Sequence, residues 1–233
     1  ENHNQVCGPG LRTVLEELDH FVGSQVESGA RISIDQWLIA ARRILKEDLE
    51  LFVWTELTLS SAKKHPVYIE EEKGNKTTFL TGIIDYGLGT IEAGKLGEIR
   101  QQLLSISTKP QNMKVLAQFR DSHVTFIIIE AKNNREKLVK HIPQVVLQCI
   151  ALSQKGTTTD HQSVVFCLAN SKRWVFGVVD CSTKQVFHTP EVDYTGRDTL
   201  ETLLVFIFWA STVSGDILAL MQALVKPPNA KSS

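Results

Sequence analysis

Glu130 and Lys132 have the residue types and the spacing that hydrolytic chemistry requires. The apolar run Phe126–Ile129 precedes them and predicts a buried strand. Successive side chains of a strand point to opposite faces, so Glu130 and Lys132 project side by side while Ala131 turns the other way. An acid and a base held together at a strand end suit a metal site at which water is activated.

Asp85 is a second carboxylate in a comparable position, because it follows the apolar stretch from Leu80 to Ile84. We expect it to end a strand that lies near the strand of Glu130. Magnesium prefers oxygen ligands and commonly takes only one or two carboxylates from a protein. Asp85 and Glu130 are therefore the predicted ligands of Mg²⁺, for which Mn²⁺ would substitute. The long interval between the two acids requires an insertion.

The elements that must position these side chains follow from the periodicity of apolar residues. Ser33, with Gln36 three positions later, forms a capping-box pattern that predicts the start of a first long helix, which runs to about Leu57. The predicted helices cover residues 9–22, 33–57, 138–152 and about 198–225. The predicted strands cover residues 67–71, 79–86, 124–131, 163–168, 174–179 and 184–188, with a hairpin turn at Gly74-Asn75.

This order of elements indicates an α/β (α+β) protein with a mixed central β-sheet that helices cover on both sides. The strand of Glu130 leads through a helix into another strand, which predicts a crossover between parallel strands. We expect one domain over residues 1–226, with its core at about 33–190 and a frayed tail at 227–233.

The composition is that of an ordinary globular protein, with 233 residues of which 42% are hydrophobic and 22% charged. The formal net charge of −1 provides no global positive field, so nucleic acid would have to bind through local patches such as Lys63-Lys64-His65. The four cysteines form neither a CxxC pair nor a zinc-ligand pattern with histidine. This indicates reduced thiols in an intracellular protein, cytoplasmic or nuclear.

The hydrophobic run Leu203–Val225 is long enough to span a membrane, but polar residues such as Asp216 and Gln222 interrupt it. We therefore expect no membrane contact and a buried or dimer-forming helix instead. A homodimer through this helix is the predicted assembly.

Motifs of several other chemistries are absent from the sequence. It contains no GxSxG nucleophile elbow, no Walker phosphate loop and no HExxH zinc helix. The short Gly87-Leu88-Gly89 lacks the third glycine and the following helix of a dinucleotide site. These absences leave the acids and the lysine as the candidate chemistry.

The pattern of Asp85 after one strand and Glu130-Ala131-Lys132 after the next, followed by a helix with glutamines, resembles the PD-(D/E)xK nuclease superfamily. The resemblance covers roughly Ser33 to Val179, and Ile84 stands where the family motif has proline. It implies a restriction-endonuclease-like core and Mg²⁺-dependent hydrolysis of phosphodiester bonds, with DNA favoured over RNA. It also implies that the Ala131 carbonyl is a further metal ligand and that Lys132 orients or deprotonates the attacking water.

The resemblance further implies contributions from two helices. A glutamine on the second main helix contacts the site or the substrate backbone in related nucleases, and Gln144 best matches it; His141 and Gln148 share its helix face. A carboxylate on the first long helix often joins the metal, for which Glu56 is the first candidate and Asp48 the second.

A second interpretation is a non-catalytic interaction or effector module that keeps the nuclease fold. The C-terminal domains of crinkler-type and fungal proteins are such cases, and this chain resembles them in general layout. The intact set of Asp85, Glu130 and Lys132 favours the enzyme.

Overall fold

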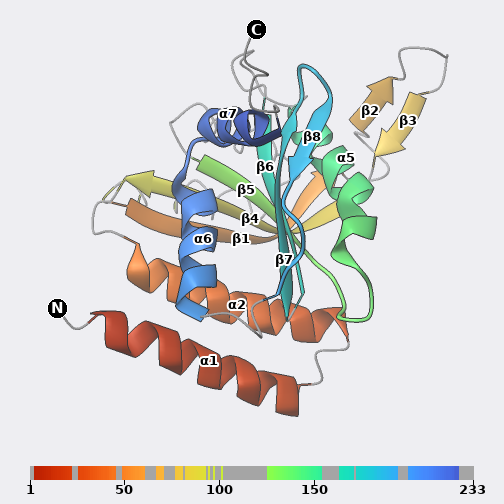
Figure 1. Cartoon of the computed structure of the whole chain (residues 1–233). Coiled ribbons are helices and arrows are strands. Elements are labelled where there is room, and N and C mark those ends of the chain that lie inside the picture. The colour runs from red at the N-terminus through yellow and green to blue at the C-terminus, as the bar shows by residue number, and fades with distance from the viewer. Residues whose placement is uncertain are drawn as a thin grey trace, which may run out of the picture.

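A computed structural model of the chain describes residues 3–22, 26–45, 49–60, 67–70, 77–80, 82–92, 94, 97, 101, 125–153, 163–170, 172–193 and 199–225. Its centre is a seven-stranded sheet in the order β1-β4-β5-β6-β7-β8, with β9 also paired to β7 (Figure 1). The strands of this sheet are β1 (Leu49–Ser60), β4 (Gly82–Glu92), β5 (Thr125–Ala131), β6 (Ser163–Ala169), β7 (Arg173–Asp180), β8 (Gln185–His188) and β9 (Val192–Asp193). The strands β2 (Val67–Glu70) and β3 (Thr77–Leu80) form a separate antiparallel ribbon.

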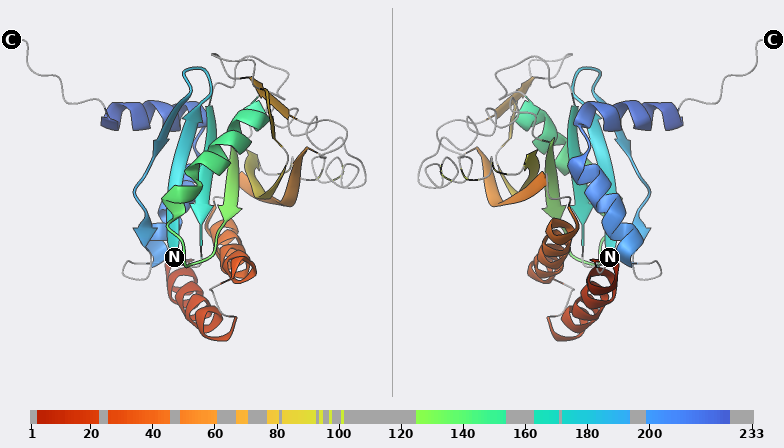
Figure 2. Two further views of the ribbon diagram at one scale, coloured as in Figure 1. Left: turned by 90° about the vertical axis from the view of Figure 1, so that its right-hand side faces the viewer. Right: turned by 90° about the vertical axis from the view of Figure 1, so that its left-hand side faces the viewer.

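Helices cover both faces of the sheet (Figure 2). They are α1 (His3–Phe21), α2 (Glu27–Ile44), the 3₁₀ helix η1 (Leu138–His141), α5 (Ile142–Ser153), α6 (Thr199–Ser211) and α7 (Ser214–Val225). Strands β5 and β6 pair in parallel and are joined through η1 and α5, whereas the other neighbouring strands pair antiparallel. The predicted mixed α/β architecture and the predicted parallel crossover are therefore confirmed.

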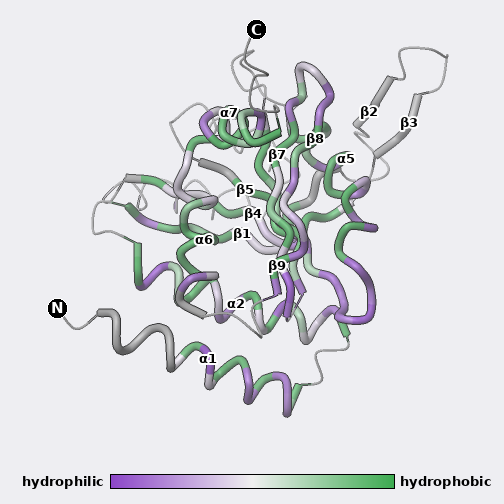
Figure 3. Tube along the Cα trace, in the orientation of Figure 1, coloured by the Kyte–Doolittle hydropathy of each residue, from purple (hydrophilic) through white to green (hydrophobic). Residues whose placement is uncertain are grey.

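The sheet separates two apolar cores. The first core lies between the sheet and helices α1, α2, α6 and α7, and its centre is Trp174, which is fully buried and makes ring contacts with Trp37, Phe176 and Phe206. The second core lies between the sheet and α5. Every residue of β6 is buried, as is every residue of β7 after Arg173. Figure 3 colours the trace by hydropathy and shows hydrophobic stretches along α6 and α7, which cover this part of the sheet. A sheet that is buried on both faces requires apolar runs in its strands, because neither face meets water.

The predicted first long helix is wrong at both ends. Helix α2 begins at Glu27, so Ser33 lies inside it and its hydroxyl donates to the Gly29 carbonyl instead of capping the helix. The helix ends at Ile44, and residues 49–60 form β1. The sequence of β1 is rich in aromatic and β-branched residues, and pairing along the length of β4 stabilises it as a strand. Its apolar residues also fit a helical stripe, which misled the prediction.

The predicted strand over residues 79–86 is also wrong. Its first part belongs to β3 in the separate ribbon, and its second part belongs to β4 in the main sheet. Strand β4 continues to Glu92, so Asp85 lies inside a strand and not at its end. Asp85 still lies near Glu130 because β4 runs antiparallel to β5, which places the beginning of β4 beside the end of β5. The turn predicted at Gly74-Asn75 lies outside the described residues.

The predicted single C-terminal helix over about 198–225 is two helices. Helices α6 and α7 are bent by 118° at their junction, and each packs buried residues such as Phe206 and Ile217 into the first core. In the described part of the chain, no single helix is long and apolar enough to cross a membrane; α6 and α7 meet that test only as this bent pair.

The second predicted helix agrees closely with η1 and α5. Its predicted apolar stripe is confirmed, since Leu138, Val145, Cys149 and Leu152 are buried in the second core and Ile142 packs against it. The predicted strands on either side of Asn170 correspond to β6 and β7. The helix therefore lies where it can present polar side chains to the end of β5.

Candidate functional site

Glu130 is the centre of the candidate site. Its side chain is 5% exposed and accepts hydrogen bonds from three side chains. The Lys132 ammonium group and the Gln144 amide donate to Oε1 at 2.8 and 2.6 Å, and the Gln148 amide donates to Oε2 at 3.1 Å. A buried carboxylate requires such donors to offset its lost hydration. The prediction that Glu130 and Lys132 project side by side is confirmed.

Asp85 contacts the same strand end from β4. Its Oδ2 accepts a hydrogen bond of 2.7 Å from the main-chain N–H of Ala131, and its Oδ1 accepts one from the Arg31 guanidinium. Because the N–H and C=O of one residue in a strand point to the same side, the Ala131 carbonyl also faces the Asp85 side of β5. The structure thus brings Asp85, the Ala131 main chain and Glu130 together.

The backbone of the neighbouring strands is irregular at this level. In a regular strand, residues an even number of positions apart lie on the same face. On β1, however, Leu51 lies in the first core and Leu57 in the second, and on β4, Ile84 lies in the second core and Tyr86 in the first. Glu56 lies between the paired positions that flank Asp85 and has a φ of 56°, which is uncommon for a residue other than glycine. The alternation of side chains is therefore reversed at Asp85, which allows its carboxylate to turn toward β5.

Burial and, second to it, the nearby charge of Glu130 raise the pKa of Asp85 to about 6, although the Ala131 N–H and the charge of Arg31 act to lower it. Two carboxylates that repel each other at a buried site favour either a proton or a cation between them. The groups around Asp85 thus offset its negative charge only in part.

Arg31 is a residue of the candidate site that the sequence analysis missed. Its guanidinium pairs with Asp85, with Glu56 at 3.6 Å and with Glu27 at 3.4 Å, and its side chain is 34% exposed. Glu27 and Arg31 are four residues apart, a spacing typical of an ion pair on a helix. That spacing was visible in the sequence, but it gave no indication that the pair lies beside Asp85.

Tyr86 and Asp35 hold this part of α2 against β4. The Tyr86 hydroxyl donates to the Arg31 carbonyl at 3.2 Å and also contacts the Asp35 side chain. Burial, followed by the charge of Asp35, raises the pKa of Tyr86, so the phenol stays neutral. The turn of α2 that carries Arg31 is therefore fixed to the strand that carries Asp85.

The loop after Lys132 is held by Arg173 at the start of β7. Its guanidinium pairs with Glu191 at 2.8 Å and donates to the carbonyls of Asn134 and Glu136. The main-chain N–H of Lys132 donates to the Ala169 carbonyl of β6 at 2.8 Å. The lysine thus leaves a rigid strand end and not a free loop.

The remaining predicted site residues have different positions. Glu56 lies on β1 and not on a helix; its side chain is 69% exposed and forms an ion pair with Arg31. Asp48 lies outside the described residues. His141 shares the helix region with Gln144 but pairs with Glu136 at 2.9 Å. The helix acid near Asp85 is Glu27, which the sequence analysis did not consider because it placed the start of the helix at Ser33.

The residues fit a single divalent cation in charge and in donor type. Four acids, Glu27, Glu56, Asp85 and Glu130, pair with two cationic side chains, Arg31 and Lys132, which leaves a net charge of −2 when all are ionised. Among the described residues, no three His, Cys, Asp or Glu side chains form a group that could hold a metal. Two acids and a carbonyl would leave the other ligand positions to water, as Mg²⁺ commonly requires.

Gln148 supplies a further unsatisfied group. It is 5% exposed, its amide nitrogen donates to Glu130, and its Oε1 has no hydrogen-bond partner within the described part of the chain. A buried acceptor without a partner is costly unless water or a ligand satisfies it. The surroundings of Glu130 are thus suited to water or a polar ligand.

A comparison of the chain with protein-family models, with curated proteins and with solved structures finds no match. The chemistry of this site must therefore be argued from its own residues.

Proposed function

We propose that this protein is a metal-dependent nuclease of the PD-(D/E)xK type that hydrolyses phosphodiester bonds, with DNA favoured over RNA. The observation that supports this function most is the position of Glu130, which receives Lys132, Gln144 and Gln148 beside the carboxylate of Asp85. A purely structural ion pair does not require a second, under-compensated acid at the same place.

Each residue of the site has a role in this proposal. Asp85, Glu130 and the Ala131 carbonyl would hold Mg²⁺ or Mn²⁺, which supplies charge neutralisation and a lower pKa for bound water. Lys132 is buried, with a side chain 10% exposed, and orients the attacking water through its ammonium group. Gln144 and Gln148 fix the Glu130 carboxylate from α5, so that its oxygens keep one orientation.

The proposal is tested by incubating the protein with plasmid, single-stranded DNA and RNA in Mg²⁺ or Mn²⁺. We expect cleavage that EDTA stops and that Asp85→Asn reduces to background, because the amide cannot neutralise the cation. Asp193→Asn makes the same change on β9, away from the site, and should retain activity. Cleavage that survives Asp85→Asn would reject the site, and cleavage of none of these substrates would reject the enzyme.

The second candidate function is a non-catalytic interaction module with the same fold. The observation that favours it is Arg31, whose guanidinium already pairs with Asp85 and Glu56 and so provides a cation where a metal would bind. In that case the protein would bind nucleic acid or protein without cleaving it, and Arg31→Gln would not restore cleavage.

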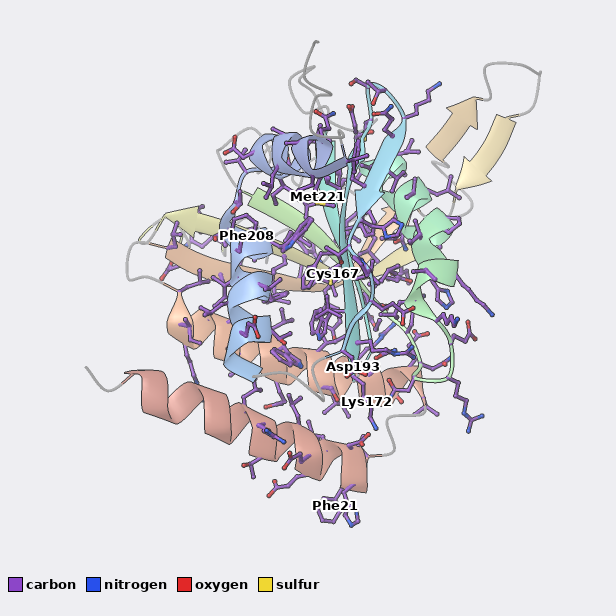
Figure 4. All side chains as sticks on the ribbon, viewed as in Figure 1. Phe21, Cys167, Lys172, Asp193, Phe208 and Met221 are labelled. Atoms are coloured by element: carbon purple, nitrogen blue, oxygen red, sulfur yellow. The ribbon has the colours of Figure 1, made fainter. Side chains whose placement is uncertain are left out.

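We also propose that the protein acts inside the cell as a homodimer joined through α6 and α7. Several apolar side chains on these helices are exposed to solvent in the single chain. Among them, Leu204 is 51% exposed, Phe208 44% (labelled in Figure 4) and Leu220 45%. An exposed apolar face of this kind is typical of an interface. Light scattering should give twice the mass of one chain, and Phe208→Asp should give the mass of one chain. A wild-type protein that is already monomeric would contradict the dimer.

A further inference from the structure

We propose that Arg31 is an exchangeable counter-ion: it neutralises Asp85 in the metal-free protein, leaves Asp85 when a divalent cation binds, and then binds a phosphate of the nucleic-acid backbone. This inference rests on the proposed function, because it assigns a further residue to the same site. It explains why the Arg31 guanidinium is paired with Asp85, a proposed metal ligand, in a chain that retains Asp85, Glu130 and Lys132.

The first step of the argument is the competition for Asp85. One oxygen of Asp85 accepts from the Ala131 main chain, and the other accepts from Arg31. A cation that binds Asp85 must therefore compete with the guanidinium for the second oxygen. Two positive charges close to one carboxylate also repel each other, so binding of the cation drives Arg31 away.

The second step is that Arg31 can move without losing all of its partners. Its side chain is 34% exposed, and Glu27 and Glu56 hold it at 3.4 and 3.6 Å, longer distances than a well-formed hydrogen bond to a carboxylate. Both of these acids are themselves largely exposed. These two ion pairs hold the guanidinium only loosely toward solvent, so its contact with Asp85 is what keeps it at the site, and a cation that binds Asp85 frees it.

The third step is the chemistry of the released group. A guanidinium has a planar set of donors that matches two phosphate oxygens, which makes arginine suited to the backbone of nucleic acids. Released Arg31 remains within one side-chain length of the metal-binding acids, where the scissile phosphate must lie. A protein with a net charge of −1 also needs local cations of this kind to hold a polyanion.

The test uses Arg31→Gln and, as the matched control, Arg43→Gln, which removes the same charge from an exposed position on the same helix. Titration with Mn²⁺ at pH 8, without nucleic acid, should show about two- to fivefold tighter binding for Arg31→Gln than for the wild type. Arg43→Gln should match the wild type. Unchanged or weaker Mn²⁺ binding by Arg31→Gln would overturn the counter-ion role. If this variant does not fold, Arg31→Lys provides the same comparison with a smaller expected increase.

A second measurement tests the exchange with phosphate. An uncleavable phosphorothioate oligonucleotide, added with Ca²⁺, should bind Arg31→Gln about tenfold more weakly than the wild type or Arg43→Gln. Equal binding would overturn the phosphate contact. Failure of the proposed nuclease activity is a separate result. If the protein does not cleave but Arg31→Gln binds Mn²⁺ more tightly, the counter-ion role is supported and the nuclease is not. If the protein cleaves but Mn²⁺ binding is unchanged in Arg31→Gln, the counter-ion role is overturned and the nuclease is not. Absence of Mn²⁺ binding by both proteins would overturn the counter-ion and the metal site together.

Discussion

Substitution of Lys132 by methionine is expected to lower the rate of metal-dependent cleavage by about 10²–10⁴-fold, the range typical of a lost acid–base or water-positioning group. The ammonium group lies 2.8 Å from Glu130 inside a buried site, and the other two side chains that donate to Glu130, Gln144 and Gln148, carry no charge that could replace it. Methionine keeps the length of the aliphatic part and removes the charge. Lys140→Met, at an exposed position near the start of α5, is the control and should keep wild-type activity.

The same substitution is expected to lower the free energy of unfolding by about 3–5 kcal/mol, because it leaves the Glu130 carboxylate buried without its cation. Adding Glu130→Gln should recover most of this loss, since a neutral amide needs no counter-charge. Chemical denaturation of the two variants measures both effects. A double variant that is stable but inactive would separate the chemical role of the pair from its structural role; a Lys132→Met protein that is both stable and active would contradict the assignment.

The second large effect is a dependence of stability on pH that arises from Asp85. Its pKa is about 6 in the folded protein and 3.8 when unperturbed, so the folded state holds the proton more tightly than the unfolded state. The stability from this group is therefore fully present below pH 3.8 and is lost as the pH rises through 6. We expect a loss on the order of 2–3 kcal/mol between pH 4 and pH 7.5 in EDTA.

The contribution of Asp85 is isolated by the difference between the wild type and Asp85→Asn. The amide does not titrate, so the difference in unfolding free energy should change across this pH range by the amount above. Burial also raises the pKa of Asp35, which acts in the same direction but is common to both proteins and cancels. A difference that stays constant with pH would contradict the shifted pKa. Addition of Mg²⁺ at pH 7.5 should stabilise the wild type and leave Asp85→Asn unchanged.

The expected effect of replacing Lys132 and the expected pH dependence from Asp85 both follow from how the charges of the site are balanced. Glu130 is compensated by a lysine and two glutamines, whereas the described part of the chain offers Asp85 the Ala131 N–H and a shared, partly exposed arginine. The uncompensated charge is therefore concentrated at Asp85. A divalent cation would remove this imbalance, and this is why the metal site, the pH dependence and the role of Arg31 can be tested by related experiments.

Local pattern in the sequence was sufficient for part of the site. The alternation of a strand placed Glu130 and Lys132 on one side, and the period of a helix placed Gln144 and Gln148 on one face. These predictions hold because the spacing of side chains within one strand or helix depends only on backbone geometry. The order of strands and helices likewise predicted a mixed α/β fold.

Tertiary structure decided the rest. Asp85 is near Glu130 because β4 and β5 pair antiparallel, and not because Asp85 ends a strand. Glu56 was expected on a helix but lies on β1, since a segment with apolar residues at mixed spacing becomes a strand when a partner strand is available. Arg31 and Glu27 reach the site only because α2 packs across the sheet beside β4. Periodicity along the chain cannot specify which elements become neighbours, and the partner of Asp85 depends on that choice.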